Sequence, residues 1–158
     1  MSSRTLVVSA TVIVLSIFVT GGWAQQKYVP RADEELYGTW TNGQNSGDWF
    51  RPQKLVLTAN QYAEYCNTEA LPTFTWRLRI DDKWTDTDGN IWYKVFAIGT
   101  GCFKGHSTQE LYKLSKSGTV MERALEMTTT GKDDPTLYPK GIDPNAPVSY
   151  WILRREGK

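Results

Sequence analysis

The chain has 158 residues, of which 40% are hydrophobic and 13% are aromatic, and it contains 18 Lys and Arg residues and 17 Asp and Glu residues. This length suits one domain, and a net charge of +1 without runs of like charge argues against nucleic acid or an anionic membrane as the main partner. Seven tryptophans supply enough large rings to fill a core or to line a cavity.

The first 24 residues have the pattern of a secretory signal peptide. Arg4 gives a positive start, residues 6–19 are mostly apolar, and Gly22-Trp23-Ala24 offers the small residues that a signal peptidase recognises. A retained membrane anchor is the alternative, but the apolar run is shorter than the ~20 residues of a spanning helix. We therefore expect cleavage after Ala24 and export to the periplasm or the medium. The mature domain, residues 25–158, would have no integral membrane segment.

Beyond this segment, alternating or apolar runs of strand length recur between Gly, Asn, Asp and Pro residues, and no long amphipathic helix is predicted. A short helical turn is expected at 32–35. Eight strands are expected near residues 36–43, 54–59, 62–67, 73–82, 91–98, 109–115, 119–127 and 149–155. The fourth run has the clearest alternation of apolar and polar residues.

The connections between these strands fall into two classes. Short turns are expected at 59–60, 86–89 and 117–118, and longer links at 42–53, 67–72, 99–108 and 128–148. Short and long connections alternate along the chain. In an up-and-down meander, alternate connections lie at opposite ends, so all the tight turns would share one end. The sequence predicts an all-β fold, an eight-stranded antiparallel up-and-down β-barrel with one closed end and one elaborated open end.

Two features are predicted at the open end. Cys66 ends the third strand and Cys102 follows the fifth, and two cysteines in an exported chain usually form a disulfide. This bridge would close a loop of about 35 residues and contribute about 3–4 kcal/mol; the alternative is two reduced, buried thiols. The proline-rich loop 128–148 is expected to form an ordered flap over the open end, where a protein partner could also bind.

Gly38-Thr39-Trp40 opens the first strand and Arg154-Arg155 closes the last one. In this arrangement the chain resembles the calycin superfamily, specifically its small bacterial lipocalin-like domains. The resemblance implies that Gly38 and Trp40 belong to the closed end, with Arg154 or Arg155 packed across the indole ring. A guanidinium over an indole face gains a cation–π contact while it covers the end of the barrel.

The sequence offers no catalytic constellation. His106 is the only histidine, and an exposed loop residue is a simpler interpretation of it than a general base with Asp133 or Asp134. Zinc-type Cys/His spacing, a calcium loop and a Gly-rich phosphate loop are absent from the sequence. Strand carboxylates are expected on the solvent face: Glu64, Asp82, Glu110, Glu122 and Glu126. We therefore expect no enzyme activity, no metal and no cofactor.

Large apolar side chains are expected to face the lumen and to line a ligand site: Tyr62, Phe74, Trp76, Trp92, Phe96, Tyr112, Met121 and Leu125. Such side chains suit an eight-stranded barrel that holds one small apolar or aromatic ligand, and they could equally fill the interior. The sequence therefore predicts an exported lipocalin-like binding protein. The alternative is a cell-envelope module with a filled core that binds a protein or a glycan through its loops.

Overall fold

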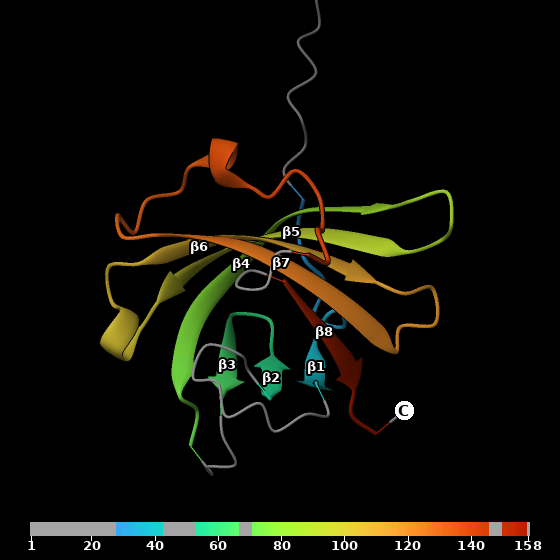
Figure 1. Cartoon of the computed structure of the whole chain (residues 1–158), viewed down its shortest axis with the longest axis horizontal. Coiled ribbons are helices and arrows are strands. Elements are labelled where there is room, and N and C mark those ends of the chain that lie inside the picture. The colour runs from blue at the N-terminus through green and yellow to red at the C-terminus, as the bar shows by residue number, and fades with distance from the viewer. Residues whose placement is uncertain (1–27, 43–52, 67–70, 146–149, 158) are drawn as a thin grey trace, which may run out of the picture.

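The computed structural model describes residues 28–42, 53–66, 71–145 and 150–157. Eight antiparallel strands follow one another around a closed barrel, and β8 pairs with β1 to complete it (Figure 1). The strands are β1 (Gly38–Thr41), β2 (Lys54–Leu57), β3 (Gln61–Tyr65), β4 (Phe74–Thr85), β5 (Ile91–Gly99), β6 (Ser107–Leu114), β7 (Val120–Thr128) and β8 (Tyr150–Arg155). The predicted all-β, up-and-down barrel is confirmed. The predicted signal peptide, residues 1–24, lies outside the described residues.

Helical structure is limited to short segments in the described part of the chain. Two 3-10 helices, η1 (Gly101–Phe103) and η2 (Pro135–Leu137), lie in loops. Among the described residues, no helix is long and apolar enough to span a membrane. The helical turn expected at 32–35 is instead a pair of turns before β1, where the Tyr37 N–H donates to the Glu34 carbonyl oxygen at 3.0 Å.

The two ends of the barrel differ in their connections. The short turns after β2, β4 and β6 lie where β1 begins and β8 ends, and we call this the closed end. The longer connections after β1, β3, β5 and β7 lie at the opposite, open end. Gly89 and Gly118 adopt φ values of 85° and 67° in two of the short turns, a region that other residues rarely enter. The predicted sorting of the turns follows from this topology.

An indole and a guanidinium close the barrel at the closed end. Trp40 is fully buried, and its Nε1 donates to the Leu36 carbonyl oxygen at 3.0 Å. Trp40 and Arg155 are paired across β1 and β8, and the guanidinium carbon lies 4.4 Å from the indole ring centroid. Arg155 also donates through Nε to the Gly118 carbonyl at 3.0 Å and through Nη1 to the Tyr37 carbonyl at 3.1 Å. The last strand is thereby fastened to the first.

Arg155, and not Arg154, makes this contact. Arg154 is paired with Thr41 on the outer face and is exposed. Gly38 adopts a φ of 135°, and a Cβ atom added there would lie 3.2 Å from the Arg155 Nη1. The glycine before Trp40 therefore allows the guanidinium to approach the backbone of β1.

Carboxylates of the segment before β1 are held by Lys83 of β4. Its Nζ lies 2.8 Å from Glu34 Oε2 and 2.7 Å from Glu35 Oε2. The Tyr93 hydroxyl of β5 donates to the same two oxygens at 3.2 and 3.1 Å. Glu34 is buried, and a buried carboxylate is stable only when it is paired and hydrogen-bonded. These contacts hold the first described segment against the closed end.

Aliphatic side chains from most of the strands fill the barrel beside Trp40. The buried core there includes Leu55, Leu57, Ile80, Val95, Leu114, Met121 and Leu153. Full burial of each such side chain is worth roughly 1.5–3 kcal/mol relative to exposure. The closed half of the barrel is therefore a packed core.

No disulfide joins Cys66 and Cys102, so the predicted bridge is wrong. Cys66 is buried after β3, whereas Cys102 is exposed in η1. The strands that precede the two cysteines, β3 and β5, are not neighbours, because β4 lies between them, and a disulfide needs Cα atoms within roughly 7 Å. The inward-facing residue of η1 is Phe103, whose ring stacks on Trp76 at a centroid distance of 5.2 Å. The alternative of two buried thiols holds for Cys66 alone.

The loop after β7 does not form the expected flap over the open end. Its described part, residues 129–145, turns back along the outer wall of the barrel (Figure 1, orange to red). Asp133 forms an ion pair with Arg79, and the Tyr138 hydroxyl donates to Asp81 Oδ2 at 2.6 Å, both on the outer side of β4. We call this segment the outer loop. It forms part of a groove on the outer wall.

Candidate ligand-binding site

A cavity of about 380 Å³ occupies the open half of the barrel interior. Its lining comprises Tyr62, Glu64, Phe74, Trp76, Phe103, Thr108, Arg123, Leu125, Glu126, Met127 and Trp151. These residues come from five strands and from η1, so the cavity exists only once the barrel has closed. Its volume lies within the range of about 300–1,000 Å³ that is usual for small-molecule sites.

A buried cluster of charges separates this cavity from the filled closed half. Arg123 of β7 and Glu110 of β6 are both 0% exposed, and Glu64 of β3 is 8% exposed. Arg123 Nε donates to Glu110 Oε2 at 2.7 Å, and Arg123 Nη1 donates to Glu64 Oε1 at 2.5 Å. Two carboxylates thus share one guanidinium inside the barrel.

Hydroxyl groups complete the coordination of Glu110. Its Oε1 accepts from the Tyr62 hydroxyl and from Thr108 Oγ1, each at 2.6 Å. Its Oε2 accepts from the Tyr112 hydroxyl at 2.5 Å in addition to Arg123. Burial alone would raise the pKa of Glu110, but the charge of Arg123 and these hydrogen bonds hold that pKa below its usual range. Glu110 is therefore ionised at neutral pH.

Aromatic rings form the walls above this cluster. Phe103 contacts Phe74 edge to face at 4.7 Å and stacks on Trp76 at 5.2 Å. Trp151 of β8 lies on the opposite wall, with the Arg123 guanidinium carbon 5.0 Å from its ring. The cavity therefore combines apolar walls with a few convergent polar groups, the usual composition of a small-molecule site.

The structure places most of the predicted lumen residues inside the barrel. Tyr62, Trp76, Tyr112 and Met121 belong to the buried core, Phe74 packs against it, and Leu125 lines the cavity. Tyr112 and Met121 lie below the cavity and are not among its lining residues.

The expectation that Trp92 and Phe96 face the lumen is wrong. The inward residues of β5 are Tyr93, Val95 and Ala97, which belong to the buried core. Because side chains alternate along a strand, Trp92 and Phe96 point outward. Apolar residues occupy both faces of β5, so its sequence did not show which face is inside.

The solvent-face expectation is also wrong for Glu64 and Glu110. It holds for Glu126, which is exposed, and for Glu122, which pairs on the outer wall with Lys113 at 3.3 Å. Asp82 lines a groove on the outer wall. Isolated carboxylates on alternating strands usually face solvent. Glu64 and Glu110 instead share Arg123, which lies on a different strand from either of them.

Sequence periodicity did contain a signal for the buried charges. Glu64 lies two residues from Tyr62, Glu110 lies two residues from Tyr112, and Arg123 lies midway between Met121 and Leu125. All four of those neighbours were expected in the lumen, and residues two apart share a face of a strand. Buried charges are stable only when they are paired, so an arginine and two glutamates on the predicted inner face indicate that they meet inside the barrel.

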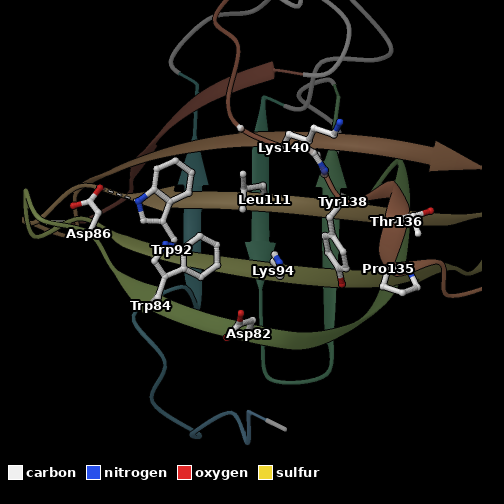
Figure 2. Close-up of a pocket in the computed structure, with 12 residues that line it drawn as sticks. Asp82, Trp84, Asp86, Trp92, Lys94, Leu111, Pro135, Thr136, Tyr138 and Lys140 are labelled. Atoms are coloured by element: carbon white, nitrogen blue, oxygen red, sulfur yellow. Dashed lines mark hydrogen bonds between the residues drawn. The ribbon is translucent and has the colours of Figure 1, made fainter. Parts of the chain in front are cut away.

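A second cavity, of about 660 Å³, lies on the outer wall beneath the outer loop (Figure 2). Trp84 and Trp92, paired across β4 and β5, stack at a centroid distance of 5.8 Å with their planes 9° apart. The Trp92 Nε1 donates to Asp86 Oδ2 at 2.8 Å, and Tyr138 of the outer loop lies across from the two indoles. We call this site the outer groove.

His106 lies beside the cavity and has no catalytic neighbour among the carboxylates considered from the sequence. Its ring contacts Phe103 edge to face at 5.5 Å. Asp133 instead pairs with Arg79, and Asp134 accepts from the Thr136 N–H at 3.0 Å. Within the described segments, no three His, Cys, Asp or Glu side chains are grouped as a metal site would require.

Comparison with known proteins gave no match for this chain, whether to a protein-family model, to a curated protein or to a solved structure.

Proposed function

We propose that this protein is an exported lipocalin-like binding protein that takes a small apolar or aromatic molecule into the open half of its barrel. The observation that carries the proposal is the cavity of about 380 Å³ beside the charge cluster. A barrel that served only as a scaffold would be expected to fill this volume with side chains, as the closed half does. Export is supported by the sequence of the first 24 residues.

The lining of the cavity supports an aromatic or apolar ligand. Phe74, Trp76, Phe103 and Trp151 present ring surface, and aromatic pairs gain roughly 0.5–1.5 kcal/mol beyond the area that they bury. None of the described residues of the outer loop lines this cavity. A ligand could therefore pack against Trp76 and Trp151 without displacing that loop.

Calorimetric titration with fatty acids, retinoids, haem and simple aromatic compounds tests the proposal. The variant Leu125→Trp should fill the cavity and abolish binding. Ile152→Trp is the matched control, because Ile152 lies on the outer face of the adjacent strand and is exposed. Circular dichroism checks that both variants fold. Equal binding by Leu125→Trp and the wild type would contradict a lumen site, and binding of none of the compounds would count against the proposal.

A second candidate function is glycan binding at the outer groove. The stacked pair of Trp84 and Trp92 favours it, since the flat apolar face of a pyranose ring packs on an indole. Asp82, Asp86 and Lys94 around the indoles could hydrogen-bond sugar hydroxyls. Affinity electrophoresis in a panel of soluble polysaccharides should show retardation that is lost in Trp84→Ala and kept in Leu125→Trp. Migration that is the same in every gel would remove this candidate.

A further inference from the structure

The two carboxylates of the charge cluster differ in how completely they are satisfied. Glu110 accepts four hydrogen bonds, from Arg123, Tyr62, Thr108 and Tyr112. Glu64 accepts one from Arg123 Nη1 and one from Trp76 Nε1, the latter at 3.1 Å. A carboxylate has about four accepting positions. Glu64 therefore retains accepting capacity with respect to the described side chains.

Glu64 is also the member of the cluster that the cavity reaches. Its side chain is 10% exposed and lines the cavity, whereas the side chains of Arg123 and Glu110 are 0% exposed. The ion pair with Arg123 fixes the position of the Glu64 carboxylate. A ligand that enters the cavity thus meets a carboxylate oxygen at its base.

The charge balance has a definite sign. Glu64 and Glu110 together carry two negative charges against one positive charge on Arg123. Among the described residues that line the cavity, Arg123 is the only cation. In a water-poor interior, an excess negative charge favours a cationic ligand and disfavours an anionic one.

The aromatic walls favour the same kind of ligand. Cations are attracted to the faces of aromatic rings, and most strongly to tryptophan. Trp76 contacts Glu64 directly and forms one wall, while Phe74 and Phe103 lie beside it. A carboxylate at the base of an aromatic cavity provides both an ion-pair partner and a cation–π surface.

We infer that the ligand of the lumen is a small organic amine with an aromatic or apolar body, and that its ammonium group pairs with Glu64. This inference rests on the proposed binding function and specifies the chemical class of the ligand. The ammonium N–H groups would fill the remaining accepting positions of Glu64, and the body would pack against Trp76, Phe103 and Trp151. A fatty acid would add a further negative charge to the cluster, and a neutral compound would not offset the excess negative charge.

A set of compounds with one shared ring system tests the inference. Calorimetric titration would compare phenethylamine, 2-phenylethanol and phenylacetate, and then tryptamine, indole-3-ethanol and indole-3-acetate. We expect each amine to bind at least tenfold more tightly than its alcohol and each carboxylate to bind more weakly than the alcohol. If an alcohol binds as tightly as its amine, the inference fails while the proposed binding function stands. If none of the six binds, and the wider set of apolar compounds does not bind either, both fail.

Charge removal at Glu64 gives an independent test. Glu64→Gln keeps the shape of the side chain and should lower amine affinity about tenfold while alcohol affinity stays within twofold. Glu126→Gln is the matched control at the exposed rim and should change amine affinity less than threefold. Equal losses for amine and alcohol in Glu64→Gln would show a structural role only and would overturn the pairing. If Glu64→Gln fails to fold, the amine-to-alcohol ratio of the wild type decides the question.

Discussion

Two arginines lie against tryptophans in this barrel, one at the closed end and one at the base of the open cavity. At the closed end, Arg155 lies 4.4 Å from the Trp40 ring and donates to backbone carbonyl oxygens. At the base of the open cavity, Arg123 lies 5.0 Å from the Trp151 ring and donates to Glu64 and Glu110. The arginine beside the tryptophan therefore donates to neutral carbonyl oxygens at the closed end and to charged carboxylates at the base of the cavity.

This difference follows from burial and bears on the proposed function. Arg155 is partly exposed, so water stabilises its charge and carbonyl acceptors are sufficient. Arg123 is completely buried and needs carboxylates, whose charges then exceed its own. At the closed end the arginine joins the last strand to the first, whereas the open half contains charged groups that, in the proposed function, a ligand contacts.

The largest effect is expected from Arg123→Met. This change leaves Glu64 and Glu110 close together in the interior without a cation, and the loss of one partner of a buried ion pair typically costs about 3–5 kcal/mol. Urea denaturation should show this decrease in the free energy of unfolding. The control, Arg154→Met on the outer face, should change it by less than about 0.5 kcal/mol. A loss below about 1 kcal/mol in Arg123→Met would show that the cluster is not the electrostatic centre described above.

Arg155→Met should cost less, about 2 kcal/mol. It removes charged hydrogen bonds to the Gly118 and Tyr37 carbonyls and the contact with Trp40, but it leaves no charge stranded in the core. Urea denaturation measures the cost. Lumen binding should be unchanged, because Arg155 lies at the far end from the cavity. Ligand affinity that falls together with stability would mean that the two ends are coupled and would weaken the comparison.

The sequence predicted the closed end better than the open cavity. Period-two runs and Asp-Gly-type turns located the strands, and their order placed Trp40 beside a terminal arginine. Those signals are local or depend only on the strand count. The charge cluster is only partly local: Arg123 lies 13 residues from Glu110 on the β6–β7 hairpin but 59 residues from Glu64. Glu64 joins the other two only after β3 takes its place around the barrel.

The residues on the outer wall were also predicted wrongly, for a related reason. Trp92 and Phe96 are apolar and outward-facing, and a two-sided apolar strand has no preferred face in sequence. Residues 129–145 cover part of that wall, where Leu111 of β6 is buried beneath the outer loop. A loop that folds onto the outer wall cannot be distinguished, by composition alone, from one that covers the open end.

A titration of the free energy of unfolding against pH should show an effect of intermediate size from the carboxylates at the closed end. Hydrogen bonds from Lys83 and the backbone lower the pKa of Glu35 from 4.5 to about 2. A lowered pKa means that the stabilisation is fully present above about pH 4.5 and is lost as the pH falls toward 2. Because the Glu35 side chain is 48% exposed, we expect only on the order of 1 kcal/mol after solvent screening.

The Glu35→Gln variant isolates this contribution. Its deficit in the free energy of unfolding should be present at about pH 6 and should shrink toward zero near pH 2. Glu156→Gln, an exposed glutamate just beyond β8, is the matched control and should show no such trend. A deficit for Glu35→Gln that is constant across this pH range would mean that the carboxylate stabilises the closed end through packing and not through charge.

The smallest effect is expected from the thiols, and it bears on how the open end is held together. A bridge between Cys66 and Cys102 would have contributed about 3–4 kcal/mol, so its reduction would be the dominant event at that end. With Cys66 buried and Cys102 exposed in η1, a reductant or the change Cys102→Ser should shift the free energy of unfolding by less than about 0.5 kcal/mol. A thiol reagent should modify Cys102 in the folded protein and Cys66 only after unfolding. Two cysteines that do not react, together with a large loss of stability in reductant, would indicate that the Cys66–Cys102 disulfide forms after all. The open end would then be fastened as firmly as the closed end, and the contrast between the two arginines would no longer describe how the barrel is stabilised.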